Sequence, residues 1–228
     1  VAHELKAPVA AIEGYLDLIV SNLDPGMEKY RAPLERCKGR AGVLQQLIRE
    51  LLDISQIELA PIDRTLEMFS PFPILADVCG FFKGEADKRG VKMNVETSKQ
   101  SVSIRGDPGE MNRIFTNLIS NAIKYNQQNG SINISSGIHG AYWRCSVTDT
   151  GIGIPPEHIA SIGEEFFRVK NPVTVKISGT GLGISIVKRL LDLNHARLMV
   201  ASEEGHGSTF TVYWPLDACV ITNRPPKS

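Results

Sequence analysis

At 228 residues the chain is long enough for one large domain or two modest ones, and its 42% hydrophobic content is ordinary for a packed globular protein. Its 25 basic and 25 acidic residues balance, which excludes a global attraction to nucleic acid or to an anionic membrane surface. No run approaches the roughly 20 apolar residues that cross a bilayer, and we expect no signal peptide at the start of this sequence.

Helical periodicity is already present at the first residues, so we expect part of the first helix to lie upstream, in a longer protein. We expect this fragment to be cytoplasmic, with attachment to an inner membrane only through missing upstream segments. The cysteines are scattered and lack metal-binding spacing, which predicts buried thiols in a reducing compartment. They are Cys37, Cys79, Cys145 and Cys219.

Two apolar stripes of helical spacing occupy the first quarter of the chain. The first runs from Leu5 to Leu23, and the second runs from Leu34 to Leu51 after a break at Pro25. A single hairpin cannot bury both stripes, so we expect two chains to close a four-helix bundle and form a homodimer. The alternative is that the stripes pack against the remainder of the same chain.

Beyond Pro61, which ends the second helix, strand and helix patterns alternate. Strands are predicted at 65–69, 91–95, 131–135, 142–148, 196–201 and 208–214, and helices at 71–88, 110–125 and 182–193. A turn is expected at 137–140, and the irregular residues 155–178 are typical of a flap or lid.

The predicted fold class is α+β, in three parts. A helical hairpin covers 1–60, a sandwich of helices on a mixed sheet covers 61–222, and a loose tail covers 223–228.

Three motifs in the second part suit a nucleotide site. Asn117 and Asn121 are four residues apart on one helical face, where their amide oxygens suit a hard cation such as Mg²⁺; taken alone, they could be two exposed helix asparagines. Asp149 follows a strand and precedes a Gly-x-Gly turn, so its carboxylate could accept from an adenine amino group, or else form an Asx turn. Residues 179–183 precede a helix whose N-terminus could face phosphates, or they form a mobile hinge; they are no Walker site.

The order of these motifs resembles the histidine kinases, whose ATPase fold is shared with gyrase, HSP90 and MutL. Residues 117–125 resemble the N box, 149–155 and 179–183 the first two glycine boxes, 165–169 the F box, and 205–210 the last glycine box. One departure is Gly163, where family members often carry a phenylalanine, which could loosen the lid.

The resemblance implies ATP and Mg²⁺ as cofactors. It implies that Asn121 is the Mg²⁺ ligand, that Asn117 supports metal and phosphates, that Lys124 and Arg168 meet phosphates, and that Tyr125 lies beside the nucleotide. The remaining residues expected to bind nucleotide are Asp149, Gly151, Gly153, Gly179, Thr180, Gly181, Leu182, Gly183 and Thr209.

His3 is the predicted phosphoacceptor. Its imidazole is largely neutral near pH 7, with an ordinary pKa of about 6.5, and the adjacent Glu4 resembles the family residue that orients or deprotonates the ring. Taken alone, His3 could be a solvent-facing helix histidine. The resemblance implies that the phosphoryl group then passes to an aspartate on a response-regulator receiver domain. Ala7 stands where relatives that dephosphorylate the regulator carry a polar residue, so kinase activity is the expected one.

Two other functions remain open at this point. The chain could be a catalytically silent dimeric scaffold that binds ATP, or an ATPase of the same fold without transfer to histidine. An ATPase of this kind uses a catalytic glutamate where this chain has Asn117.

Overall fold

The computed structural model describes residues 12, 14–21, 25–59, 64–97, 102–169, 171, 174–177 and 179–216. It divides into two units, one comprising 1–61 with 178–180 and the other 62–177 with 181–228. The predicted tail at 223–228 and the first turns of the predicted first helix lie outside the described residues.

The first unit contains two helical segments that run antiparallel. Residues 14–21 are helical, a short 3-10 helix (η1) spans Pro25–Tyr30, and α2 spans Arg31–Leu59. Asp17 pairs with Lys38 at 2.7 Å, and Arg31 donates to the Val20 carbonyl at 3.5 Å. The contacts join an early residue of one segment to a later residue of the other, which is the arrangement of a helical hairpin.

The apolar stripe of α2 is only partly covered within one chain. Ala41 and Ile54 are buried, whereas Leu44 and Leu51 remain 47% and 48% exposed. Cys37, which was predicted to be buried, is exposed; it lies on the same helical stripe as Leu44 and Leu51, which the described residues leave half-exposed. Cys79 and Cys145 are buried as predicted, and Cys219 lies outside the described residues.

The second unit is a mixed sheet covered by helices. Its elements are β1 (Glu67–Phe69), α3 (Pro71–Lys88), β2 (Lys92–Thr97), β3 (Ile104–Gly106), α4 (Pro108–Lys124), β4 (Ser131–His139), β5 (Tyr142–Asp149), α5 (Pro156–Ile159), η3 (Thr174–Lys176), α6 (Gly183–Leu193), β6 (Arg197–Glu203) and β7 (Gly207–Pro215).

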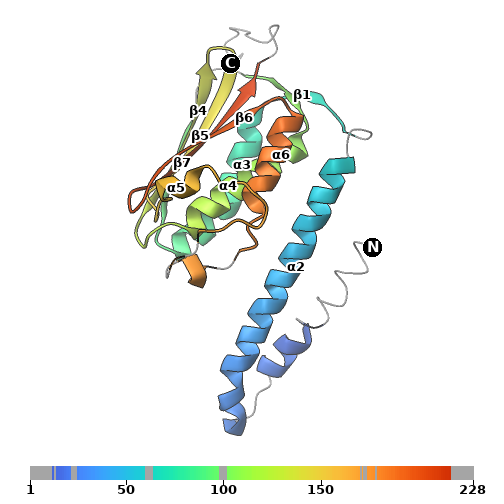
Figure 1. Ribbon diagram of the computed structural model, residues 1–228, viewed down its shortest axis with the longest axis vertical. Helices are drawn as coiled ribbons and strands as arrows, with labels where there is room; N and C mark the ends of the chain where they lie inside the picture. Colours follow the sequence, from blue (N-terminus) through green and yellow to red (C-terminus); the bar gives the residue numbers. More distant parts are fainter. Residues whose placement is uncertain are drawn as a thin grey trace, which may run out of the picture. The chain divides into compact units, whose positions relative to one another are not determined.

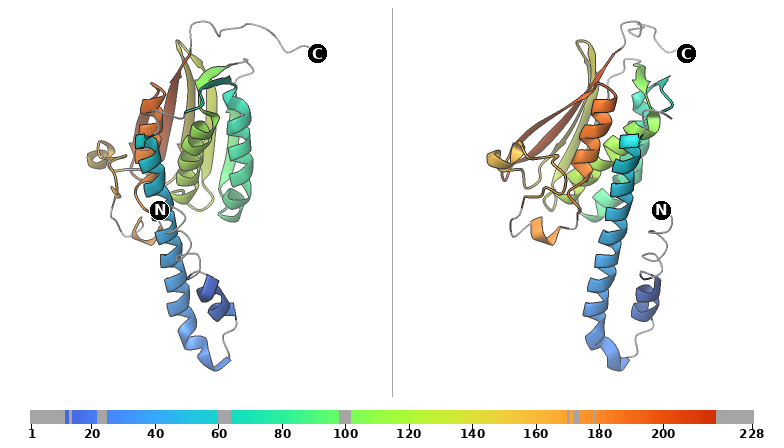
Figure 2. Two further views of the ribbon diagram at one scale, coloured as in Figure 1. Left: turned by 90° about the vertical axis from the view of Figure 1, so that its right-hand side faces the viewer. Right: turned by 45° about the vertical axis from the view of Figure 1, so that its right-hand side comes forward.

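Five strands form the main sheet, in the order β2-β4-β5-β7-β6. The edge strand β2 is parallel to β4, and the other neighbours are antiparallel. Helices α3, α4 and α6 lie on one face of this sheet, with α4 between the other two (Figures 1 and 2). The predicted class, helices on a mixed sheet after a helical N-terminal part, is therefore confirmed.

The core of this unit lies between α4 and the central strands. Trp143 on β5 and Trp214 on β7 are fully buried, and Phe72 and Phe115 meet the Trp143 ring edge-on at 6.5 and 5.9 Å between centroids. Helix α4 begins at Asp107, whose carboxylate accepts from the Gly109 and Glu110 amides, so its direction is set by an N-cap.

One local prediction was wrong, and one short strand was missed. The turn expected at 137–140 is shorter, because Gly137 remains in β4 opposite Arg144 and only Gly140 takes a positive φ, of 61°. The short strand β3, which pairs with β1, was not anticipated. Among the helices that the structure describes, none is long and apolar enough to cross a membrane.

Candidate nucleotide site

Asp149 ends β5 in the middle of the sheet, opposite Ile132 of β4 and Ser208 of β7. Its carboxylate accepts hydrogen bonds from the Gly151 amide, at 2.8 Å, and from the Ser208 amide. Burial raises the pKa of this carboxyl from 3.8 to about 6, although the two hydrogen bonds lower it. A buried carboxylate that keeps unused acceptor positions can receive a ligand's amino group.

The glycine turn after Asp149 contacts the end of α4 on one side and the β6–β7 turn on the other. The Ile152 amide donates to the Tyr125 carbonyl at 3.0 Å, and the Gly205 amide donates to the Ile152 carbonyl at 2.8 Å. A Cβ on Gly151 would lie 2.3 Å from the Tyr125 carbonyl oxygen, and one on Gly153, whose φ is +66°, would lie 1.9 Å from the Glu203 carbonyl oxygen. Larger residues cannot occupy either position without moving backbone.

Asn117 and Asn121 leave α4 on the face that meets the start of α6. A Cβ on Gly183 would lie 2.8 Å from Asn117 Oδ1 and 3.9 Å from Asn121 Nδ2. Asn117 Nδ2 donates to the Arg113 carbonyl at 2.9 Å, so Oδ1 is the amide atom directed at Gly183. The absent side chain at 183 lets the N-terminus of α6 approach the Asn117 amide oxygen closely, and an amide oxygen beside a helix N-terminus suits a cation-bound phosphate.

Lys124 and Tyr125 follow at the end of the same helix. The Lys124 ammonium lies 5.8 Å from the centre of the Tyr125 ring, and Tyr125 is the residue that caps α4. The Tyr125 carbonyl contacts the glycine turn, as described above, so the end of α4 connects the two asparagines with the Asp149 region.

Arg168, which was predicted to contact phosphate, bonds to its own loop in this structure. Its guanidinium donates to the carbonyls of Thr174 at 3.1 Å and Ile177 at 2.6 Å. The Thr174 hydroxyl is buried and donates to the Val169 carbonyl at 2.5 Å. The contact with phosphate therefore stays a prediction.

The predicted run 179–183 is divided between the two units. Gly179 and Thr180 belong to the first unit, where the Thr180 hydroxyl donates to the Glu50 carboxylate. Gly181 has a φ of +84°, and a Cβ there would lie 2.8 Å from the Phe166 backbone. Leu182 is fully buried, so only its backbone can face a ligand.

The unusual Gly163 has a local explanation. Its φ is +95°, a conformation that favours glycine, and a Cβ there would lie 2.5 to 2.7 Å from the end of the Lys188 side chain. Lys188 Nζ donates to the adjacent Ile162 carbonyl. The lysine side chain therefore lies where a side chain of residue 163 would be.

The last glycine box contributes two residues near Asp149: Thr209, which was predicted, and Ser208, which the sequence prediction missed. Thr209 donates to Thr148 at 3.1 Å, one register position away from Asp149. Ser208 is the residue opposite Asp149, and its amide contacts the carboxylate directly. The pairing of β5 with β7 sets Ser208 opposite Asp149. The only signal for Ser208 in the sequence was that it directly follows the Gly-x-Gly segment. Gly207 also matters here, because a Cβ on it would lie 2.0 Å from the Asp149 carbonyl oxygen.

The predicted phosphoacceptor pair, His3 and Glu4, lies outside the described residues, as does Ala7. Within the residues that the structure does describe, no group of three or more His, Cys, Asp or Glu side chains could hold a metal ion. The asparagine pair stays a predicted cation site.

Two family models match the chain. One, described as "Histidine kinase-, DNA gyrase B-, and HSP90-like ATPase", matches residues 106–218, and the other, "His Kinase A (phospho-acceptor) domain", matches residues 1–60. A similar curated protein is the phosphate regulon sensor protein PhoR of Pseudomonas aeruginosa, 30% identical over 228 residues, which are 100% of this chain and 51% of PhoR. The sensor histidine kinase RcsC of Salmonella typhimurium is 32% identical over 95% of this chain and 23% of RcsC.

Solved structures agree with these matches. Full-length ShkA in complex with AMPPNP has a TM-score of 0.75 at 26% identity, over 99% of this chain and 46% of that one. The Acinetobacter baumannii histidine kinase AdeS, at 22% identity and a TM-score of 0.64 over 95% of this chain and 99% of AdeS, supports the fold alone. The chain spans about half the length of PhoR and a smaller part of RcsC.

Proposed function

This chain belongs to the sensor histidine kinases, and on that premise we propose that it transfers the γ-phosphoryl group of ATP to His3 and then to an aspartate of a response-regulator receiver domain. The helical hairpin at 1–60 is proposed to dimerise and to present His3. Residues 61–222 are proposed to bind ATP, with 223–228 as a tail.

The observation that supports this proposal best is the approach of Gly183 to Asn117 and Asn121, described above. It sets the Asn117 amide oxygen beside the N-terminus of α6, an arrangement that suits phosphates and a cation. Asp149 lies at the end of β5, where its buried carboxylate suits the adenine amino group. The two ends of ATP thus have separate and chemically matched partners.

Each remaining residue has a proposed role in binding. Asn121 would hold Mg²⁺, with Asn117 supporting it, and the bound ion would neutralise charge on the phosphates. Lys124 and Arg168 would contact phosphates, Tyr125 would lie beside the nucleotide, and the glycines would let backbone approach it.

The proposed transfer is an in-line displacement at the γ-phosphorus. A lone pair on the His3 nitrogen remote from Glu4 forms the N–P bond, and the bond from phosphorus to the bridging oxygen breaks, so that ADP leaves with the electron pair. Glu4 accepts a hydrogen bond from the other ring nitrogen, which orients the ring and stabilises its positive charge.

The direct test is incubation of the chain with γ-labelled ATP and Mg²⁺. We expect acid-labile label on the wild-type chain, and no label on His3→Ala although nucleotide binding persists. The matched control is His139→Ala, because His139 is an exposed histidine near the end of β4; it should label normally. Free phosphate without labelled protein would favour the ATPase function instead, and neither product would favour a scaffold. Label retained in His3→Ala would move the acceptor elsewhere.

The proposed metal dependence has its own test. Asn121→Asp adds a negative charge beside the phosphates, so we expect weaker use of Mg²⁺-ATP with the dimer intact. Titration of labelling with Mg²⁺ for wild type and variant measures this. Identical metal dependence in the two would remove Asn121 from the role of metal ligand.

The proposed homodimer is supported by the apolar residues that α2 exposes, Leu44 and Leu51. Sedimentation equilibrium should report a dimer, and Leu44→Asp with Leu51→Asp should shift it toward monomer. Mixing His3→Ala chains with Asn121→Asp chains then tests whether transfer occurs between subunits, since only transfer between subunits restores label in the mixed dimer.

The receiver partner is inferred from the family, and Ala7 bears on what the chain does to it. A methyl group cannot orient a water molecule by hydrogen bonding. We therefore propose that the chain phosphorylates its regulator and lacks the phosphatase route that uses a polar side chain at this position. A phosphorylated receiver that releases inorganic phosphate faster when the chain carrying His3→Ala is added would contradict this.

A further inference from the structure

Gln127 lies in the loop that follows α4, and its side chain bonds to two separate turns of the second unit. Gln127 Nε2 donates to the Gly151 carbonyl at 3.2 Å and to the Gly205 carbonyl at 3.3 Å. Both partners are carbonyl oxygens, which only accept hydrogen bonds, so the nitrogen end of this amide must face them. One side chain therefore connects the glycine turn after β5 with the β6–β7 turn.

These two turns supply the two amides that bond to the Asp149 carboxylate. The Gly151 amide donates to Asp149 Oδ1 at 2.8 Å, and the Ser208 amide, just after the β6–β7 turn, also donates to this carboxylate. Asp149 itself is buried at the end of β5. Gln127 thus bonds to both of the turns whose amides orient this carboxylate.

The peptide unit between Gly151 and Ile152 is held at both of its polar groups. Its carbonyl accepts from Gln127, and its amide donates to the Tyr125 carbonyl at 3.0 Å. Each of the two turns contains two glycines, whose backbone has more conformational freedom than that of other residues. Rotation of this peptide unit would break two hydrogen bonds at once, so the loop after α4 limits the freedom of the glycine turn.

The loop that carries Gln127 is itself fixed beside the glycine turn. Asn126 Oδ1 accepts from the Gln127 amide at 3.0 Å and from the Thr150 hydroxyl at 3.3 Å, and Asn126 Nδ2 donates to the Ser131 carbonyl at 3.1 Å. The Ser131 amide donates to the Thr150 hydroxyl at 2.8 Å. A Cβ on Gly130 would lie 2.1 Å from Asn126 Oδ1, so this side chain occupies the space that a larger residue at 130 would need. The amide of Gln127 is therefore presented from an ordered backbone.

The position of Gln127 separates its effect on geometry from its effect on stability. Its side chain is exposed, and a hydrogen bond that water can replace adds little to the free energy of unfolding. Loss of its two bonds should therefore change the freedom of the turns around Asp149 more than it changes folding.

We propose that Gln127 is a positioning residue for recognition of the nucleotide base: by bonding to both turns, it holds the Asp149 carboxylate in the direction in which it accepts from the 6-amino group of adenine. This rests on the proposed function, in which Asp149 receives that group. A carboxylate with a less fixed direction still leaves room for a purine, but it discriminates less between an amino group and a carbonyl oxygen.

The test measures this discrimination with ADP and inosine diphosphate, which carry the same phosphates and differ around the 6-position of the purine. Neither can donate a γ-phosphoryl group, so binding is measured without transfer. The Kd of each is determined by calorimetry with Mg²⁺ for the wild-type chain, Gln127→Ala, Gln127→Glu and the matched control Gln128→Ala. Gln128 is the next residue and another exposed glutamine of the same loop. Urea unfolding establishes that each variant is folded.

We expect the wild type to bind ADP about tenfold or more tightly than inosine diphosphate. The ratio of the two Kd values should fall by about threefold to tenfold in Gln127→Ala and Gln127→Glu, since neither replacement can donate to the two carbonyls. Gln128→Ala should keep the wild-type ratio. In an Asp149→Asn chain, Gln127→Ala should leave the ratio unchanged, because Gln127 acts through the carboxylate.

An equal loss of affinity for both nucleotides would assign Gln127 a structural role only and overturn the proposal. An unchanged ratio in folded Gln127→Ala would overturn it as well, as would a further fall of the ratio in the Asp149→Asn background. If Gln127→Ala does not fold, Gln127→Glu, which keeps the size and polarity of the side chain, decides. A wild-type chain that binds the two nucleotides equally would instead refute the proposed contact of Asp149 with adenine, so the two failures are distinguishable.

Discussion

Replacing Asp149 by asparagine should stabilise the second unit while it impairs nucleotide recognition. The Asp149 carboxyl is 6% exposed, and its pKa is raised from 3.8 to about 6 mainly by burial. Because the folded pKa lies above the unfolded one, the folded state binds more protons between these values, and stability falls as pH rises through this window. Ionisation of this carboxyl at neutral pH therefore destabilises the folded unit.

The size of the effect follows from the two pKa values. At about 1.4 kcal/mol per pH unit, the raised pKa costs the folded unit about 3 kcal/mol near pH 8 and about 1 kcal/mol near pH 4.5, relative to a side chain that stays neutral. Asparagine carries no charge and keeps an acceptor for the Gly151 amide. The gain in unfolding free energy should thus be about 3 kcal/mol near pH 8 and about 1 kcal/mol near pH 4.5.

Urea unfolding followed by tryptophan fluorescence measures this gain, because both tryptophans, Trp143 and Trp214, lie in the core of the second unit. The control is Asp192→Asn, which removes an exposed carboxylate on α6 and should shift stability equally at both pH values. An Asp149→Asn chain that is less stable than wild type near pH 8, or whose gain does not depend on pH, would refute the reasoning. The same titration predicts that ATP affinity of the wild type weakens as pH falls below about 6.

Three further predictions concern ATP binding, stability and cysteine reactivity. Gly183→Val should weaken ATP binding by about tenfold or more, since even its Cβ would lie 2.8 Å from Asn117 Oδ1 and must displace that side chain; normal calorimetric affinity would contradict this. Trp214→Phe leaves the Arg105 carbonyl without its indole donor, so urea titration should show a loss of about 1 to 3 kcal/mol. Burial raises the pKa of the Cys79 thiol to about 11, so mass spectrometry after alkylation of the folded chain should find label on exposed Cys37 well before Cys79.

The elements with local signals were predictable. Helix α3 was predicted with its observed bounds, because Ser70-Pro71 opens it and Arg89-Gly90 closes it. The buried stripe of α4, including Met111, Ile114 and Leu118, follows from helical spacing. These features depend on residues close in sequence, which is the range over which propensity and periodicity act.

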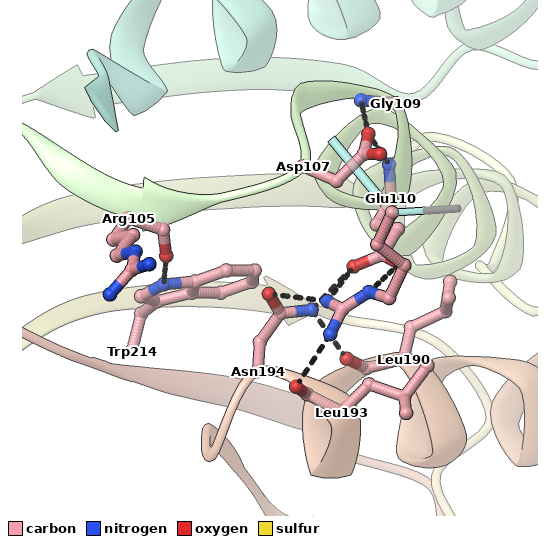
Figure 3. Close-up of polar contacts among 9 residues, drawn as sticks. Arg105, Asp107, Gly109, Glu110, Leu190, Leu193, Asn194 and Trp214 are labelled. Carbon is pink, nitrogen blue, oxygen red and sulfur yellow. Dashed lines mark hydrogen bonds and ion pairs between the residues drawn. The ribbon is translucent and has the colours of Figure 1, made fainter. Parts of the chain in front are cut away.

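Features that depend on distant residues were not predictable in this way. Arg64 donates hydrogen bonds to Glu110 and Asn194, which lie 46 and 130 positions away, and nothing near Arg64 in the sequence indicates either partner (Figure 3). Ser208 was missed because only the register of β5 with β7 sets it opposite Asp149. The strand β3 is three residues long, too short to show an alternating pattern.

The parallel pairing of β2 with β4 determines where this chain can be divided. The match to the ATPase family begins at residue 106, yet β2 (92–97) forms one edge of the sheet and α3 carries Phe72 against Trp143. A shortened protein starting at residue 106 would leave β4 as a bare edge and uncover aromatic core, both of which promote aggregation. Excision ahead of Arg64 would retain the edge strand, its helix and the hydrogen bonds of Arg64 to Glu110 and Asn194.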